Sequence, residues 1–307
     1  MDYREHRVPP PLDTFVECVW FLADTPGGRG AAARPLSLDG ARDRQRILPD
    51  GCVELIFHFR GRFLAISATG QSLRQPACFV VGLLTSPFVI APAAHVDTMG
   101  VRFRPGGAYP FFQGPLSALT DRVAGLDDLW GSATARRLWQ QLAEMHVARR
   151  SGPAAKAAGD AARVSAISRE LLQRYTSVER DRPTASAVGD LVGTSGRASI
   201  DSVAARAGMT TRHLQRRFAE RVGVSPKVLA RILRFQRTLL LRAAADRSRP
   251  DWVRVAVECG YTDQSHLIHD YAAFAGETPA TLLAAESELS TYFTAPQRLA
   301  ALFGARR

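Results

Sequence analysis

The sequence predicts an α+β protein in which a β-rich domain of the jelly-roll or barrel type is followed by an all-α domain. Two observations support this fold class. In residues 1–110, short apolar runs alternate with proline and glycine, as they do in β-rich domains. Beyond residue 162, nearly every segment has the apolar spacing of an amphipathic helix. The 307 residues are enough for about two domains, each with its own core.

Composition limits the class of partner. An apolar content of 46% with 22% charged residues is typical of a soluble globular protein. The 40 Lys and Arg residues exceed the 29 Asp and Glu residues, which favours nucleic acid or another anionic surface. No apolar run approaches the roughly 20 residues that span a bilayer, and the start MDYREHRVPPP lacks the apolar core of a signal peptide. We therefore predict a cytoplasmic protein without a membrane partner.

The clearest strand unit is ILPDGCVELIFHF. Residues 49–51 supply turn chemistry, and the run from 53 to 59 places its odd-numbered residues on one face. Glu54, Ile56 and His58 then lie on the other face. Further strands are predicted within residues 78–92 and 96–112.

Helical spacing begins near residue 126 and continues to about residue 150. The small, polar stretch RRSGPAAKAAGDAA, residues 149–162, predicts the main linker. We therefore divide the chain into a sensory or dimerisation domain (1–148), a linker and helix (149–180), a helical domain (181–285) and a C-terminal tail (286–307).

Glu54, His58 and His95 raise the question of a metal site, because carboxylate and imidazole are common ligands. The N-terminal domain resembles a cupin-like barrel, but metal-binding cupins carry an HxH pair and this sequence has none. We predict no metal, and satisfied polar contacts for Glu54 and His58. Arg102 and Arg104 alternate along one strand, where they either hold an acidic effector or pair with carboxylates of the domain.

Sequence features of catalysis are missing. Cys18, Cys52, Cys78 and Cys259 have no metal-like spacing, which suits reduced thiols that pack in the core. The sequence contains no nucleophile elbow, P-loop or dinucleotide fingerprint. We therefore predict no catalytic residue and no cofactor.

Residues 199–222 predict a pair of short helices. Gly208 ends the first helix, and Thr210 is a suitable N-cap for the second. The first helix has apolar residues at the spacing i, i+3, i+4 and i+7, namely Ile200, Val203, Ala204 and Ala207.

On the second helix of this pair, Leu214 and Phe218 point to the core, and Arg212, Gln215 and Arg216 share the opposite face. Arginine pairs with guanine and glutamine with adenine in the major groove. The segment therefore predicts a helix-turn-helix unit that reads DNA. The alternative is a pair of ordinary amphipathic helices with solvated arginines.

The pattern repeats 53 residues later, where Leu267 and Tyr271 match Leu214 and Phe218. Asp263 takes the N-cap position. The equivalent polar face carries Gln264, Ser265 and His269. Between the units, SPKVLARILRFQRTLLLRAAA predicts one long helix, which would hold them over two major-groove segments about 34 Å apart.

Residues 199–283 resemble the DNA-binding domain of AraC/XylS-family transcriptional regulators. The resemblance is carried by A-x-x-x-G-Y-T-D-Q-S-H-L and G-E-T-P in the second unit, and by AARAGMTTRHLQRRF in the first. The N-terminal half, with LPDGCVEL and GVRFRPGG, is similar to an uncharacterised β-rich domain of many bacterial regulators. The resemblance implies double-stranded DNA as partner, a small-molecule effector or a homodimer, and RNA polymerase if the chain is an activator.

The two units differ in charge. Residues 196–249 hold thirteen Lys and Arg against three Asp and Glu, whereas residues 250–285 hold one against five. His269 stands where the family usually has a basic residue. We therefore predict that the first unit anchors and reads DNA, and that the second adds discrimination. The alternative is that the second unit packs against the first and enters no groove.

The leading hypothesis is a sequence-specific transcription regulator. An enzyme hypothesis also stands, in which a metal-dependent or alkyl-transfer barrel is fused to a DNA-targeting module. A third hypothesis is an architectural protein that binds DNA without base discrimination, which competition with unrelated duplex would distinguish.

Overall fold

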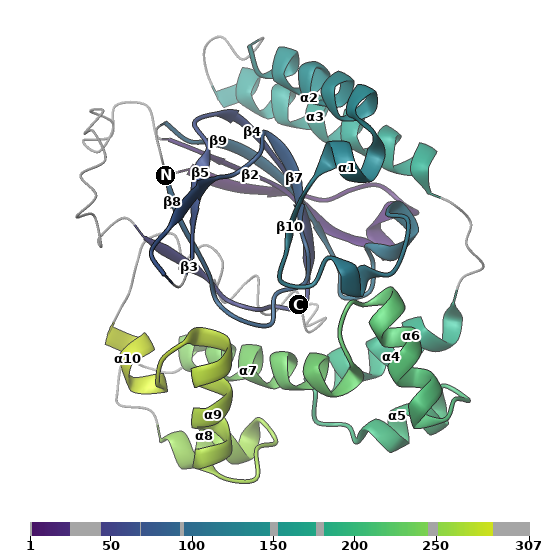
Figure 1. Cartoon of the computed structure of the whole chain (residues 1–307), viewed down its shortest axis with the longest axis vertical. Coiled ribbons are helices and arrows are strands. Elements are labelled where there is room, and N and C mark those ends of the chain that lie inside the picture. The colour runs from purple at the N-terminus through teal and green to yellow at the C-terminus, as the bar shows by residue number, and fades with distance from the viewer. Residues whose placement is uncertain are drawn as a thin grey trace.

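The computed structural model describes residues 2–24, 44–67, 69–92, 95–147, 153–175, 181–244 and 251–284 of the chain. Within these residues, a two-sheet domain packs on a helical domain (Figure 1). Residues 149–152 of the predicted linker and the predicted tail, 286–307, lie outside the described residues.

The N-terminal domain is a pair of facing antiparallel sheets, which confirms the β-rich prediction. The sheets enclose a small apolar cluster that includes Trp20 from one sheet and Phe63 from the other. They form no closed barrel among the described residues. In spatial order, the six-stranded sheet contains β1 (Asp2–His6), β2 (Val16–Ala23), β9 (Asp97–Phe103), β4 (Val53–Arg60), β7 (Cys78–Val81) and β10 (Val123–Gly125), and the four-stranded sheet contains β3 (Gln45–Ile47), β8 (Phe88–Pro92), β5 (Phe63–Ile66) and β6 (Ser72–Arg74).

Strand β4 has the predicted alternation. Leu55 and Phe57 are fully buried in the larger hydrophobic core, whereas Ile56 packs in the cluster between the sheets. Gly100 of β9 lies opposite Trp20 in the register, and a Cβ at this glycine would lie 2.1 Å from the indole ring. The absence of a side chain at this position therefore lets Trp20 lie across the sheet.

Three helices cover the six-stranded sheet, namely α1 (Leu126–Trp130), α2 (Ser132–Val147) and α3 (Pro153–Arg174). The prediction of a linker is wrong for residues 153–162, because they begin α3. Asp160 of this segment is fully buried and accepts a hydrogen bond of 2.8 Å from Arg4 Nε. The stretch is rich in alanine, which is the strongest helix former. The small alanine side chain also allows the helix to pack closely on a sheet.

The helical domain contains α4 (Arg182–Gly193), α5 (Ile200–Arg206), α6 (Thr211–Arg221), α7 (Pro226–Ala244), α8 (Trp252–Glu258), α9 (Gln264–Ala275) and α10 (Pro279–Ala284). The predicted caps are confirmed. Thr210 accepts a hydrogen bond from the backbone N–H of His213, and Asp263 accepts one from that of His266. Ser225 caps the long helix α7 by accepting a hydrogen bond from the backbone N–H of Val228.

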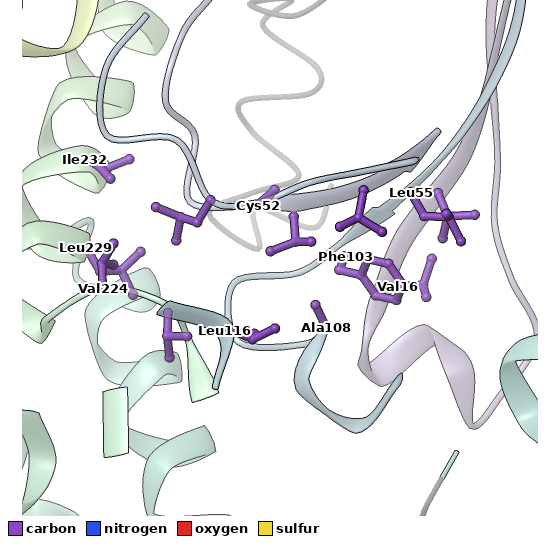
Figure 2. Packing of buried hydrophobic residues seen from close by; sticks show 14 of the residues in the cluster. Val16, Cys52, Leu55, Phe103, Ala108, Leu116, Val224, Leu229 and Ile232 are labelled. Carbon is purple, nitrogen blue, oxygen red and sulfur yellow. The ribbon is translucent and has the colours of Figure 1, made fainter. Parts of the chain in front are cut away.

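One hydrophobic core runs through both domains. Figure 2 shows side chains from the end of the sandwich lying beside side chains of the helical domain. The residues near this boundary include Cys52 and Leu116 of the N-terminal domain and Val224, Leu229 and Ile232 of the helical domain. Polar contacts also cross this boundary. Gln236 Nε2 donates to the carbonyl of Pro49 at 2.5 Å, and Thr120 Oγ1 donates to that of Gly223 at 2.7 Å.

Candidate nucleic-acid interface and internal cavity

The first helix-turn-helix unit consists of α5 and α6. Val203 and Ala204 of α5 are buried against Leu214 and Phe218 of α6, and the small alanine lets the helices approach closely. Gly208 makes the turn at φ +66°, a left-handed conformation that glycine adopts without a steric penalty. The turn at Gly208 and the small side chains of α5 thus determine how α6 is oriented relative to α5.

The polar face of α6 is exposed. Arg212, Gln215 and Arg216 point away from the core, and none of them forms a hydrogen bond or ion pair with another described residue. Neighbouring arginines behave differently, because Arg217 and Arg221 reach the carboxylate of Asp181 at 2.7 and 3.2 Å. The three predicted reading residues of this unit are therefore available to a partner.

The second unit consists of α8 and α9. Ala256 and Cys259 are buried against Leu267 and Tyr271, as the repeat in the sequence predicts. On the outer face, Ser265 and His269 are exposed and Gln264 is half-buried. This face carries no arginine or lysine, so it offers hydrogen-bonding groups without a permanent positive charge.

A buried ion pair fixes α9 on α7. Asp270 is fully buried, and its Oδ1 accepts hydrogen bonds from Nε and Nη2 of Arg231 at 2.9 and 2.6 Å. Thr238 and Tyr271 add a buried hydroxyl pair at 2.8 Å. Three residues beyond Arg231 along α7, Arg234 donates to the carbonyl of Gly196, which precedes α5. Helix α7 therefore holds both units, one toward each of its ends (Figure 1).

These contacts refine the charge count made from the sequence. Arg217, Arg221, Arg231 and Arg234 belong to the basic surplus of residues 196–249, but each is engaged in a contact within the protein. The sequence count therefore overstates the number of cations that face a partner. Asp181 and Asp270 lie 36 to 40 residues from the arginines that they pair with, so local inspection of the sequence does not show these pairs.

An internal cavity of about 60 Å³ lies between the two sheets. Its walls are mainly apolar, with Trp20, Ile56, Phe63, Phe88 and Ile90 among the lining residues. The volume exceeds that needed for a single water, so there is room for a small molecule or several waters.

One end of the cavity is charged. Arg102 Nε donates to Glu54 Oε1 at 2.7 Å, and Arg102 Nη1 lies 3.1 Å from Asp50 Oδ2. Burial raises the pKa of Glu54 to about 7, although the Arg102 guanidinium opposes this shift. Of the two interpretations of Arg102, the one in which it pairs with carboxylates of its own domain is confirmed. Arg104 is exposed and donates to the carbonyl of Asp13, so it does not join the cavity.

His58 lies elsewhere on the cavity wall. Its Nδ1 lies 2.9 Å from Thr98 Oγ1 and its Nε2 lies 3.1 Å from Gln75 Oε1, so both ring nitrogens have protein partners. Burial lowers the pKa of His58 to about 4, which keeps the ring neutral. His95 is exposed beside Asp24. Among the described residues, no three histidine, cysteine, aspartate or glutamate side chains are grouped to hold a metal.

The four cysteines are free thiols, and three of them are buried. Burial raises the pKa of Cys259 to about 12 and raises those of Cys18 and Cys52 as well. A raised pKa removes the thiolate that nucleophilic chemistry needs.

None of the helices in the described part of the chain combines the length and apolar composition that crossing a membrane requires.

Two family models match the chain. The model of a helix-turn-helix domain matches residues 203–285, and that of a domain of unknown function, DUF6597, matches residues 4–125. No curated protein is significantly similar to the chain.

Solved structures of ToxT from Vibrio cholerae are among those similar to the chain. A structure at 1.65 Å resolution is 10% identical with a TM-score of 0.44, over 92% of this chain and 98% of that one. ToxT from strain O395 is 12% identical with a TM-score of 0.41, over 79% and 97% of the two chains. Wild-type ToxT with bound unsaturated fatty acid is 10% identical with a TM-score of 0.41, over 80% and 96%.

The match over residues 203–285 coincides with the two units built on α7. The C-terminal part of the chain is therefore a helix-turn-helix domain of the AraC type, and it follows a β-rich domain of unknown function.

Proposed function

We propose that the chain is a transcription regulator that binds duplex DNA sequence-specifically and responds to a small molecule. The observation that carries this proposal is the pair of units on one buried helix, each with an exposed polar face. The residues proposed to contact DNA are Arg212, Gln215 and Arg216 of α6 and Gln264, Ser265 and His269 of α9. We also propose a cytoplasmic location, because duplex DNA is the partner.

The chemistry of the two faces supports an unequal division of work. Arg212 and Arg216 lie one turn apart on α6 and can each donate two hydrogen bonds to a guanine or contact phosphates. The α9 face can hydrogen-bond bases, but its segment also carries three exposed carboxylates, since two of its five, Asp270 and Glu277, pair with arginines. Repulsion between these carboxylates and DNA is overcome only when the first unit holds the protein in place. A homodimer and a contact with RNA polymerase stay predictions.

The test of DNA recognition is a selection of bound sequences from a random duplex pool with the full chain. We expect one enriched site, bound with a log–log salt slope of about −0.9 for each phosphate neutralised. The competition is repeated with unrelated duplex. Equal binding to both duplexes would instead identify an architectural protein, and an absence of salt dependence would contradict the assigned faces.

Segment 46–52 supports a role for the cavity in controlling the units. Asp50 and Cys52 line the cavity. Their neighbours face α7, because the Pro49 carbonyl accepts a hydrogen bond from Gln236 and a Cβ at Gly51 would lie 3.1 Å from Leu229. Arg46, at the start of this segment, forms an ion pair with Glu277 in the turn after α9. A single layer of chain thus separates the cavity from the second unit and α7. An effector in the cavity would act through this layer.

The first unit is attached to the N-terminal domain by other contacts, which involve Tyr109. Tyr109 donates a hydrogen bond of 3.0 Å to Glu220, and the Arg221 guanidinium lies 4.4 Å from the centre of the Tyr109 ring. Tyr109 does not line the cavity. We therefore propose that cavity occupancy changes the position of the second unit and leaves the first in place.

We expect Gln236→Leu to loosen the second unit. The substitution removes the donor to the Pro49 carbonyl, which costs about 1 kcal/mol. In hydrogen–deuterium exchange of the full chain, amides of α8 and α9 should exchange faster while those of α5 and α6 are unchanged. The control is Gln140→Leu on the exposed face of α2. Equal deprotection of both units would contradict a separate attachment.

A further inference from the structure

A second hollow, of about 380 Å³, lies between the end of β1 and one face of α3. Its volume falls within the range of small-molecule sites, about 300–1,000 Å³. The residues that matter to its chemistry are His6 and Arg7 on one wall and Ser165, Ser168, Arg169 and Leu172 on the other. The four α3 residues recur at i, i+3, i+4 and i+7, so they share one face of the helix. We call this hollow the β1–α3 groove.

The β1–α3 groove is positively charged. Arg7 and Arg169 are both exposed, and neither forms a hydrogen bond or ion pair with another described residue. The lining contains no aspartate or glutamate among the described residues. The nearby Asp160 accepts a hydrogen bond from Arg4, which lies outside the lining. Two guanidinium groups therefore face an open hollow without a compensating carboxylate in its wall.

A buried hydroxyl in the wall of the groove also points to a ligand. Ser168 is only 3% exposed, and its Oγ has no hydrogen-bond partner among the described residues. A buried polar atom without a partner costs free energy, so such atoms are rare in folded proteins. His6 Nε2 makes no hydrogen bond either and lies 3.7 Å from Asp160 Oδ2. The groove thus combines two cations with a hydroxyl and an imidazole nitrogen that a bound acceptor would satisfy.

We propose that the β1–α3 groove binds the phosphate group of a small phosphorylated molecule. Two guanidinium groups match a phosphate dianion in charge, and each can donate two parallel hydrogen bonds to its oxygens. Ser168 and His6 supply further donors to the same group. A phosphate monoester offers three terminal oxygens to these four donor groups, whereas a carboxylate offers two. Leu172, which is 41% exposed, provides an apolar contact for the remainder of the ligand.

DNA is a less suitable source of this phosphate. In Figure 1, α3 lies on the side of the sandwich away from the helical domain, whereas the units that carry the reading faces lie below it. The site is also separate from the cavity between the sheets, with which it shares no lining residue. The proposal therefore adds a second ligand site to the chain and does not depend on the effector cavity.

The probes are inorganic phosphate and acetate, titrated against the full chain at constant ionic strength while the melting temperature is recorded. All variants are made in an Arg216→Gln chain, which removes one of the two exposed arginines of α6 that could compete for phosphate. We expect phosphate to raise the melting temperature with saturation, and acetate to raise it much less. Arg7→Gln and Arg169→Gln should each weaken phosphate binding about tenfold. Arg136→Gln, an exposed arginine of α2, is the matched control and should bind phosphate normally.

Ser168→Ala separates a binding role from a structural one. Without phosphate, this variant should melt at a slightly higher temperature than the parent, the Arg216→Gln chain, because an unsatisfied buried hydroxyl is removed. The rise in melting temperature that phosphate causes should shrink. A phosphate response that is equal in the Arg7→Gln/Arg169→Gln double variant and the parent, or absent altogether, overturns the proposal. Loss of operator binding by that double variant, made without Arg216→Gln, would assign the two arginines to DNA and also overturn it.

Discussion

In a footprint on the selected operator, we expect Arg216→Ala to abolish protection of the whole site, and His269→Ala to weaken only the half bound by the second unit. Arg216 is exposed on α6 and has no partner among the described residues, so its charge and donors are available to DNA. A good bidentate contact contributes about 1–3 kcal/mol against a wrong base, and the anchoring charge is lost as well. Affinity should therefore fall by about a hundredfold or more.

Two controls accompany this footprint. Arg254→Ala removes an exposed arginine from α8 of the second unit, outside the proposed reading faces, and should leave the protected region unchanged. Circular dichroism confirms that each variant is folded. Complete loss of binding in His269→Ala, with tolerance of Arg216→Ala, would reverse the assignment of anchor and accessory. Normal binding by His269→Ala would favour the alternative in which the second unit enters no groove.

Asp270→Ala should lower the free energy of unfolding by about 3 kcal/mol, because it removes one partner of a buried ion pair. Arg231 would then keep a charge beside the aromatic ring of Phe274, 5.1 Å away, without the carboxylate. Urea denaturation of the full chain measures this change. Glu258→Ala, an exposed acid of the same unit, should change stability by less than about 0.5 kcal/mol.

The same variant tests how α9 is positioned. Because Asp270 follows His269, loss of the ion pair should also widen the range of orientations of the reading face. We expect weaker operator protection in the distal half even where the protein remains folded. Equal stability of Asp270→Ala and wild type would mean that the tyrosine and threonine hydroxyls hold α9 on α7 without the ion pair.

Local features of the fold follow from the sequence where they depend on nearby residues. The caps at Thr210 and Asp263 and the turn at Gly208 depend on side chains within a few positions, so they are predicted correctly. The alternation along β4 is also local. Helix α3 is mispredicted because a stretch of small residues suits both a flexible linker and a helix that packs closely on a sheet, and packing decides between them.

Contacts between distant segments do not follow from the sequence. The pairing of Arg102 with Glu54 requires β4 and β9 to be neighbours, which depends on the topology of the sheet. The contact of Gln236 with Pro49 joins residues 187 positions apart. The candidate reading residues on α6 and α9, by contrast, are indicated by helical spacing alone, and their role in DNA binding stays a prediction.

Because one core runs through both domains, the helical domain is not expected to remain soluble when it is produced alone. Leu229 and Ile232 of the long helix are fully buried partly because the N-terminal domain covers that side. A fragment cut at the start of α4 would carry an uncovered apolar strip, and such strips promote self-association. The helical domain is therefore not expected to fold well when it is fused to the N-terminal domain of another regulator. We expect a mutation that disturbs the N-terminal domain to reduce the solubility and the cellular abundance of the helical domain as well.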